Sequence, residues 1–358
     1  MSFVHLDVRS YFSLKEGAFA PEQLAEQAAG LGMSAVAMTD RDGLYGAARF
    51  VSACQRDGVK PILGASLTVR APAPPPRDAH VVLLAEDDTG YANLCRLLTD
   101  AQLLGERGDP WVAIEQICAH AAGMTVLLGP RSHPGRLAVA GRVDAAARLA
   151  APFREAFGPD RCVVAVEHRM DAGSATEIRT MLRFAEKLDA VAVATNPVRY
   201  LVPDDAFLAD ALECMRAIVP VASSNVSRTN SEGWLKPPAE MRALFAERPD
   251  LCDATLEVAE RCTFDLGLDQ VHFPDFPIPG GGSADAVLAE RCWRGVHERG
   301  MKQDERLRDD HHLQVRLEPG PHVRERQPEA VRVEEGAVDL VERVHVATSG
   351  PESPRSSG

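Results

Sequence analysis

Residues 35–50 read AVAMTDRDGLYGAARF, and this stretch shows the order of elements from which the fold class is inferred. Its short apolar run, residues 35–39, is typical of a strand that is buried on both faces of a parallel sheet. A polar turn with Asp40 and Asp42 follows, and a helix is expected near residues 45–56. The same order of strand, polar turn and helix recurs along the first 200 residues, so the chain is expected to be an α/β protein.

Six further apolar runs of this β type are present, and helical stretches separate them. They lie at residues 3–8, 61–69, 80–85, 124–128, 162–166 and 190–195. The predicted helices between them begin with Pro21 and include residues 91–104, 136–153 and 175–188. Alternation of this kind implies parallel βαβ units with right-handed crossovers. Seven such strands fit a barrel-like array better than a small open sheet, and a barrel carries its chemistry at the carboxyl ends of its strands.

The second part of the chain has a different character. Residues 204–262 are expected to be mostly helical, in three stretches at 204–218, 238–245 and 250–262. The stretch HFPDFPIPGGGS, residues 272–283, is rich in proline and glycine and indicates a boundary before a short helix at 284–298. Residues 301–358 hold 12 acids, 9 bases and four histidines without a sustained period, which is typical of disorder.

Composition limits the classes of function. The 358 residues suggest two domains or one large barrel with attachments. The formal net charge of -13 excludes a broadly basic nucleic-acid surface, so contact with nucleic acid would need a local patch or a part outside this chain. No apolar run is long enough to span a bilayer, and the charged N-terminus does not resemble a signal peptide, so a cytoplasmic protein is expected. The eight cysteines lack C-x-x-C spacing and are expected to be buried, reduced thiols.

Polar residues directly after the predicted strands are candidates for a functional site. In a barrel this placement indicates chemistry, but Asp40 and Asp42 could equally cap the following helix. Other segments of this kind are HLDVRSYFSLKEG at residues 5–17 and VATNPVRYLVPDDA at residues 193–206.

Together these segments resemble the N-terminal PHP (polymerase and histidinol phosphatase) domain of bacterial DNA polymerase III α subunits. The resemblance rests on an ordered set that includes FVHLDVRSYFSL, GVKPILGASL and LLAEDDTGYANLCRLL, and it covers about residues 1–300. It implies a distorted seven-stranded (β/α) barrel, similar to a TIM barrel, with a helical extension over residues 1–265. Residues 266–300 would then be a linker and the start of the polymerase palm. The tail, 301–358, is predicted to be disordered and translated outside the ancestral frame; a genuine disordered linker is the alternative.

The resemblance also implies a function. Intact members are DNA-directed DNA polymerases of replication or repair synthesis, whose palm carboxylates hold two metal ions, Mg²⁺ in this family. Those carboxylates would lie beyond residue 300, so this chain alone is expected to be non-catalytic, structural or partner-binding. The expected partners are a proofreading exonuclease or repair-polymerase accessory proteins, with DNA contacted only by other domains. The alternative is a stand-alone, metal-dependent phosphoesterase of the histidinol-phosphatase type.

The resemblance implies that the metal site of the PHP family is largely replaced in this chain. The positions that correspond to the family's ligands are Asp7, Arg9, Glu16, Arg41, Ser66, His80, Pro130, Pro197 and Arg199. Only Asp7, Glu16 and His80 could still bind a metal, and three separated ligands make a poor site. Zinc or manganese is expected only if the site is retained, and arginine cannot bind a cation.

Three of the replacements are arginines that follow three different strands. Because strand ends converge in a barrel, Arg9, Arg41 and Arg199 are predicted to form a network with Asp7, Glu16 and Asp40 in place of the metal ions. Two alternatives remain. One arginine could stay unpaired and make the cleft a phosphate-binding pocket, or all three could point to solvent.

Overall fold

The computed structural model describes residues 2–70, 79–106, 108–221, 230–270, 278 and 282–300. The chain divides into two compact units, Met1–Val271 and His272–Gly358. The predicted tail, 301–358, and most of the proline- and glycine-rich stretch at 272–283 lie outside the described residues.

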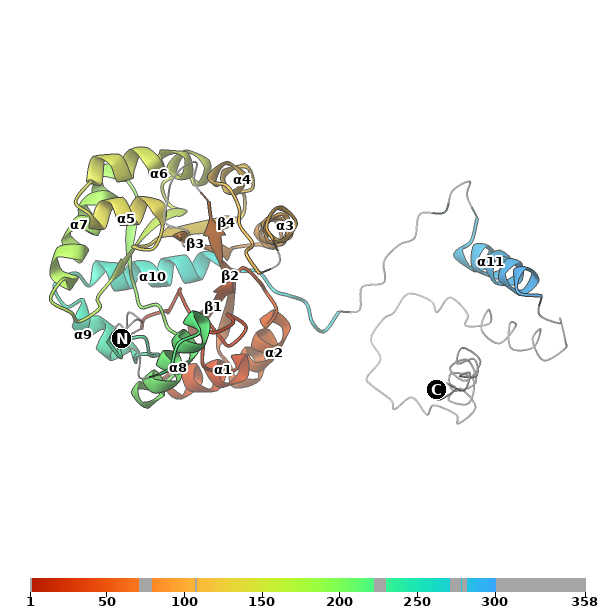
Figure 1. The fold of residues 1–358 in the computed structure, drawn as a ribbon, viewed down its shortest axis with the longest axis horizontal. Helices are drawn as coiled ribbons and strands as arrows, with labels where there is room; N and C mark the ends of the chain where they lie inside the picture. Colours follow the sequence, from red (N-terminus) through yellow and green to blue (C-terminus); the bar gives the residue numbers. More distant parts are fainter. Residues whose placement is uncertain are drawn as a thin grey trace, which may run out of the picture. The chain divides into compact units, whose positions relative to one another are not determined.

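The first unit is built on one curled, mixed sheet whose strands follow the order β1-β2-β3-β4-β5-β6 (Figure 1). Five strands run parallel, and β3 is antiparallel to both of its neighbours. The expectation of parallel units throughout is therefore wrong at β3. The connection between β2 and β3, residues 70–78, is shorter than the dozen or more residues that a parallel crossover needs. The strands are β1 (Ala35–Arg41), β2 (Lys60–Val69), β3 (Ala79–Ala85), β4 (Met124–Leu128), β5 (Cys162–Glu167) and β6 (Val191–Thr195).

The seventh predicted strand, residues 3–8, is not a regular strand, and six strands form the sheet in the described part of the chain. This segment nevertheless links the two edges of the sheet. His5 O accepts a hydrogen bond from Ala37 N of β1 (2.9 Å), and Asp7 O accepts one from Val198 N after β6 (2.9 Å). The side-chain hydroxyl of Thr39 accepts a hydrogen bond from the backbone N–H of Val8 at 2.9 Å. A side chain thus replaces a backbone partner, which makes the pairing irregular.

Eleven α-helices are present in the described residues. The predicted helix at 136–153 is two helices, because the chain turns at Gly141 with a left-handed φ of 75°. Helix α4 has only six residues and is too short to show a helical period. The bounds are α1 (Pro21–Gly30), α2 (Ala47–Asp57), α3 (Asp88–Leu104), α4 (Ile114–Ala119), α5 (His133–Val139), α6 (Val143–Phe157), α7 (Ser174–Leu188), α8 (Ala206–Ala217) after the 3-10 turn Pro203–Asp205, α9 (Pro238–Leu244), α10 (Asp250–Arg261) and α11 (Ala284–Glu298). Of these, α11 belongs to the second unit.

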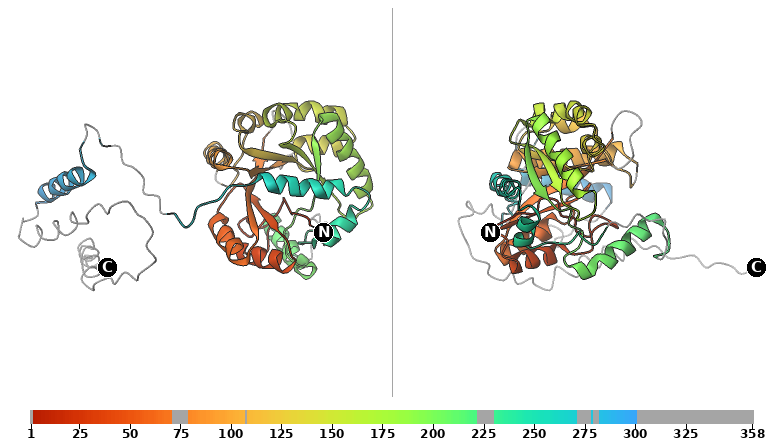
Figure 2. Two further views of the ribbon diagram at one scale, coloured as in Figure 1. Left: turned by 180° about the vertical axis from the view of Figure 1, so that it is seen from behind. Right: turned by 90° about the vertical axis from the view of Figure 1, so that its left-hand side faces the viewer.

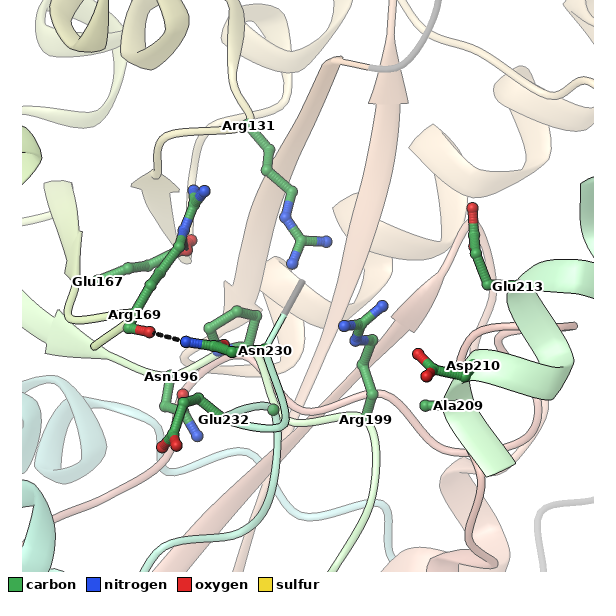
Figure 3. A pocket seen from close by; sticks show the side chains of 12 residues that line it. Arg131, Glu167, Arg169, Asn196, Arg199, Ala209, Asp210, Glu213, Asn230 and Glu232 are labelled. Atoms are coloured by element: carbon green, nitrogen blue, oxygen red, sulfur yellow. Dashed lines mark hydrogen bonds and ion pairs between the residues drawn. The ribbon is translucent and has the colours of Figure 1, made fainter. Parts of the chain in front are cut away.

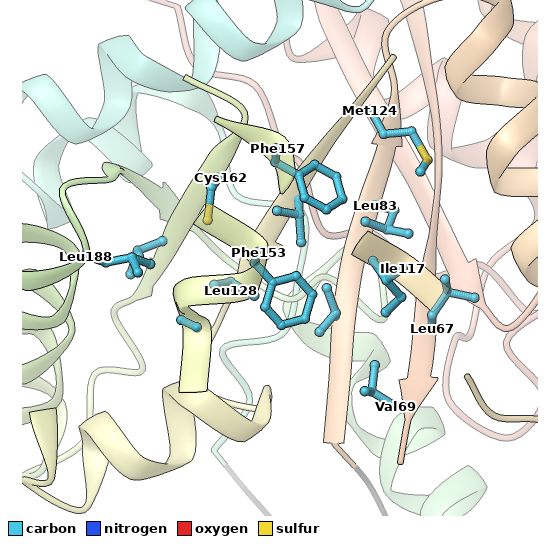
Figure 4. Packing of buried hydrophobic residues seen from close by; sticks show 14 of the residues in the cluster. Leu67, Val69, Leu83, Ile117, Met124, Leu128, Phe153, Phe157, Cys162 and Leu188 are labelled. Atoms are coloured by element: carbon cyan, nitrogen blue, oxygen red, sulfur yellow. The ribbon is translucent and has the colours of Figure 1, made fainter. Parts of the chain in front are cut away.

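The two faces of the sheet have different partners, as the alternation of side chains along a strand requires. On the outer face, Cys162 and Val164 of β5 share a buried cluster with Phe153 and Phe157 of α6 (Figure 4). On the inner face, Val163 and Ala165 of the same strand belong to a second cluster. That inner cluster is completed by Ala254, Val258 and Ala259 of α10, a helix that lies at one side of the first unit in the right-hand view of Figure 2. The next inner-face residue of β5 is Glu167, beyond this apolar cluster.

Buried Glu86, directly after β3, ties the end of α10 to the sheet. Its carboxylate accepts hydrogen bonds from Thr125 Oγ1 (2.6 Å), Arg161 Nε (2.7 Å) and Arg261 Nε (3.2 Å). Its backbone carbonyl accepts two more, from the amides of Thr263 (2.7 Å) and the next residue. The chain is therefore fixed at the point where it leaves the barrel.

Two expectations from composition can be compared with the structure. All eight cysteines are free thiols, and five of them are buried. None of the described helices combines the length and the apolar character that crossing a bilayer requires.

Candidate functional site

The predicted site residues come together at the edge of the sheet that is formed by the carboxyl ends of the parallel strands. Strands β1, β2, β4, β5 and β6 end there and β3 begins there, since β3 alone is antiparallel. The register places Arg41 of β1 beside Ser66 of β2, and Thr68 of β2 beside His80 of β3. Functional side chains gather at this end in barrels of parallel strands.

Glu16 lies between two arginines. Arg9 Nη1 is 3.3 Å from Glu16 Oε2, and Arg41 Nη1 forms an ion pair with Glu16 Oε1. Arg9 Nη2 also lies 3.4 Å from Asp7 Oδ1 and donates to Ser66 Oγ at 3.3 Å. The Arg9 side chain is only 3% exposed, so its charge is balanced by protein carboxylates rather than by water.

The charges at this site are strongly coupled. Burial opposes ionisation of Glu16, but Arg9 and Arg41 outweigh this effect and lower the pKa of its carboxyl to about 2. Burial likewise opposes the charge of Arg9, but Asp7 and Glu16 outweigh it and raise the pKa of the guanidinium. Both groups are therefore ionised at neutral pH.

Asp40 has a different role from the predicted one. It accepts hydrogen bonds from Ser10 N (2.7 Å), Ser10 Oγ (2.8 Å) and Ser13 Oγ (2.7 Å), and within the described residues it forms no ion pair. Successive residues of β1 point to opposite faces of the sheet, so Asp40 and Arg41 cannot share one face. Asp40 instead holds the loop that carries Glu16, and burial raises the pKa of its carboxyl.

The capping alternative is also wrong for this pair of aspartates. The residue before α2 is Gly46, which has no side-chain cap. Asp42 accepts hydrogen bonds from Thr68 N and Thr68 Oγ1, each at 2.7 Å, and lies 3.5 Å from Arg41 Nε. It therefore contacts Arg41 at Nε, whereas Glu16 contacts it at Nη1.

His80 lies at the start of β3 and lines a small cavity of about 20 Å³ with Arg9 and Arg131. Its Nδ1 is buried without a hydrogen-bond partner in the described structure. Burial makes the largest contribution to lowering the pKa of His80, and the charges of Arg41 and Arg9 lower it further, to about 2. The imidazole is therefore neutral at physiological pH.

The residues at this edge do not fit a metal cluster. Across the described ranges, no three His, Cys, Asp or Glu side chains lie together in a way that could hold a metal ion. Asp7 and Glu16, the retained carboxylates, both face Arg9, so a cation bound to them would lie against a guanidinium. Pro130 and Pro197 offer no side-chain donor at their positions.

A larger pocket of about 270 Å³ adjoins this cavity and shares Arg131 and Glu167 with it. Arg199 lines this pocket, and its guanidinium points toward that of Arg131 (Figure 3). Arg199 thus lies in the neighbouring pocket, whereas Arg9 and Arg41 pair with Glu16. Arg131 and Arg169 were not among the predicted site residues. The signal for Arg131 was a charged side chain only three residues after the end of β4 (Met124–Leu128).

Residues 5–169 match the PHP domain family. This part of the chain is a PHP domain. The chain is 31% identical over 311 residues to the DNA polymerase III subunit alpha of Bacillus subtilis, covering 86% of this chain and 27% of that protein. It is 33% identical over 312 residues to an error-prone DNA polymerase of Mycolicibacterium paratuberculosis, covering 83% and 28%. The resemblance to the N-terminal region of these polymerases is confirmed, and the chain spans about a quarter of their length.

The chain also aligns in part with solved structures. An amidohydrolase from Chromobacterium violaceum aligns with a TM-score of 0.40 and 16% identity, over 55% of this chain and 88% of that chain. A protein from Bifidobacterium adolescentis, described as a metal-dependent phosphoesterase, aligns with a TM-score of 0.37 and 16% identity, over 55% and 86%. The α/β class that was predicted for the PHP domain is confirmed, with six strands in place of seven.

Proposed function

We propose that this chain serves as the PHP-domain part of a DNA polymerase of the III α or error-prone type, and that its PHP domain is a structural, partner-binding module without catalysis of its own. The observation that carries the proposal is the position of Glu16 between Arg9 and Arg41. Fixed guanidinium groups supply at this edge the positive charge that metal ions supply in a metal-dependent PHP site. Arginine does so through forked hydrogen bonds and cannot activate a water molecule as a metal does.

The proposal includes a division of the chain. Residues 1–265 would be the PHP domain with its helical extension, and 266–300 a linker and the start of the palm. The partners that we propose are other subunits of the polymerase, with a proofreading exonuclease or a repair-polymerase accessory protein as the first candidates. DNA would be contacted through other domains of the polymerase, and Mg²⁺ would act only there.

Two measurements on the purified chain test the absence of catalysis. We expect no stoichiometric zinc or manganese in protein that is prepared without added metal, and no hydrolysis of p-nitrophenyl phosphate with or without Mn²⁺. Manganese-dependent hydrolysis that is lost in the His80→Ala variant would favour the phosphoesterase instead.

The partner-binding role has its own test. The chain and the exonuclease subunit of the same organism are produced together and separated by size. Elution as one complex supports the role, and separate elution at high concentration of both proteins contradicts it for this partner.

A further inference from the structure

Helix α8 turns its apolar side away from the rest of the first unit. Phe207 is 64% exposed, Met215 61%, and Ile218, directly after the helix, 89%. Only two of the twelve residues of the helix, Ala209 and Cys214, are buried. In the right-hand view of Figure 2 the helix, drawn in green, stands out from the body of the first unit. A surface helix of a globular protein normally has the opposite arrangement, with its apolar stripe toward the core.

The acidic side of α8 faces the protein instead. Asp210 and Glu213 line the pocket that also contains Arg131 and Arg199 (Figure 3). A helix of only 12 residues is marginally stable in water unless another surface covers its apolar side. Apolar side chains that gather on one exposed face are typical of a site for association with another protein surface. The outward side of α8 therefore indicates a contact surface.

The outward residues form a stripe that has a small residue at its centre. Phe207, Ala211 and Met215 follow one another at intervals of four residues, so they lie on one face of the helix. Ala211 allows a second helix to approach closely, and the larger side chains stand on either side of it. A second α8 that crosses Ala211 in the antiparallel direction fits this profile, because Phe207 of each helix then meets Met215 of the other. Contact between a methionine sulfur and an aromatic ring is favourable.

The charges at the two ends of α8 also match those of a second, antiparallel α8. Asp204 and Asp205 lie in the turn before the helix, and Arg216 lies in its last turn. In an antiparallel pair the acidic start of each helix lies beside the arginine at the end of the other, and the helix dipoles are oppositely directed. Arg216 pairs with Glu213 of its own helix, so we expect the attraction to fix the direction of the pair more than its strength.

We propose that two copies of this chain associate through α8, as an antiparallel pair with a twofold axis at Ala211. Such a contact uses the same patch on both copies and closes on itself as a dimer. The net charge of -13 opposes association over long distances, but at 0.15 M salt the screening length is only about 8 Å. The pairing is independent of the function proposed above, since neither a metal site nor a polymerase partner takes part in it.

Analytical ultracentrifugation of the full chain over a range of concentrations tests the pairing. We expect an equilibrium between monomer and dimer whose dissociation constant rises about tenfold or more in Met215→Glu, because that variant places an unpaired carboxylate inside the contact. The matched control is Leu103→Glu near the end of α3, where the replaced side chain is 78% exposed and lies outside α8. This control should dimerise as the wild type does. Both replaced side chains are exposed, so both variants should keep the circular dichroism spectrum of the wild type.

A disulfide cross-link tests the position of the twofold axis. In a Cys292→Ser background, which lacks the exposed thiol, Ala211→Cys should form a covalent dimer under mild oxidation, because the two new thiols meet at the axis. Ala217→Cys, at an exposed position on another side of the helix, should stay monomeric. A monomer at every concentration, or equal cross-linking of the two variants, would overturn the pairing. A monomer that binds the exonuclease subunit less tightly in Met215→Glu would assign α8 to that partner, which overturns the pairing and leaves the proposed function intact.

Discussion

Arg9 Nη1 lies 3.3 Å from Glu16 Oε2, although the two residues belong to a segment that forms no regular strand or helix. The loop between them is held by Asp40, which accepts hydrogen bonds from Ser10 and Ser13. A buried carboxylate of β1 thus sets the position of a buried ion pair on the opposite face of the sheet. The geometry of the site depends on this loop as much as on the barrel.

Replacing Glu16 with glutamine should destabilise the PHP domain strongly. The change leaves Arg9 buried beside a neutral group, and breaking a buried ion pair by removing one partner costs about 3–5 kcal/mol. Urea denaturation followed by circular dichroism measures the loss. The control is Glu22→Gln, which removes a partner of the half-exposed Arg49. Surface pairs contribute about 0–1 kcal/mol, so equal effects of the two variants would contradict the account of the site.

Mild acid should destabilise the protein through its buried histidines. The pKa is lowered to about 2 for His80 and to about 4 for His5, in both cases mainly by burial, and it is also lowered for His133. Below the ordinary pKa of about 6.5 the unfolded chain therefore binds protons that the folded chain refuses. The free energy of unfolding then falls as pH falls, by up to about 1.4 kcal/mol per pH unit for each histidine.

The contribution of one histidine can be isolated by substitution. Denaturation between about pH 7.5 and pH 5 should show a smaller dependence on pH in His80→Gln than in the wild type. The exposed His297 of α11 provides the control variant His297→Gln, which should keep the slope of the wild type. An unchanged slope in His80→Gln would show that its imidazole protonates equally in both states. At lower pH the Glu16 pair adds to the loss, since protonation of that carboxyl is opposed down to about pH 2.

Gly17 is expected to tolerate no side chain. A Cβ atom there would lie 2.1 Å from Ser10 O and 2.3 Å from Arg9 O, and backbone atoms cannot yield as a flexible side chain can. Gly17→Ala should therefore displace the loop that carries Glu16 and cost about 1–3 kcal/mol. The control is Gly30→Ala at the end of α1, where no atom lies within 4 Å of the new methyl group. Alanine at Gly30 should be neutral or stabilising, by up to about 1 kcal/mol.

Glu86→Ala should weaken the contacts that hold the end of α10 to the sheet. The change removes the acceptor of Thr125 Oγ1, Arg161 Nε and Arg261 Nε, and lost hydrogen bonds to a charged group cost about 1.5–3 kcal/mol each at most. We expect lower stability and faster amide exchange at the end of α10. Glu115→Ala, at an exposed position of α4, should change neither. Unchanged exchange in Glu86→Ala would assign the anchoring to the backbone carbonyl of Glu86 alone.

Much of the fold follows from local patterns. The run at residues 124–128 coincides with β4, and the runs at 35–39 and 162–166 fall within β1 and β5. Direction could not be predicted in the same way, because an apolar run has the same pattern whichever way the strand runs. The reversal of β3 depends on the length of its connection, and the irregular pairing of residues 3–8 depends on a hydroxyl of Thr39.

Site residues could be predicted where they lie at the end of a strand. They were less predictable where the conformation of a loop determines their contacts. Arg9, Arg41 and Glu16 were expected together, and they are in contact. The hydrogen bonds of Asp40 require the loop at 10–13 to fold over β1, which no periodicity indicates. The pocket of Arg131 and Arg199 depends on α8 and on the segment near Glu232, which meet only in three dimensions.

The shared carboxylate of Glu16 has a consequence for how this domain can evolve. If Arg41 alone were replaced with histidine, Arg9 would still lie against Glu16 and Asp7, where a cation would have to bind. If Arg9 alone were replaced, Arg41 would still form its ion pair with Glu16. Each single step would lose a partner of a buried charge before any metal could be gained. Building a metal site from these residues would therefore need several simultaneous substitutions, so single substitutions are not expected to produce one.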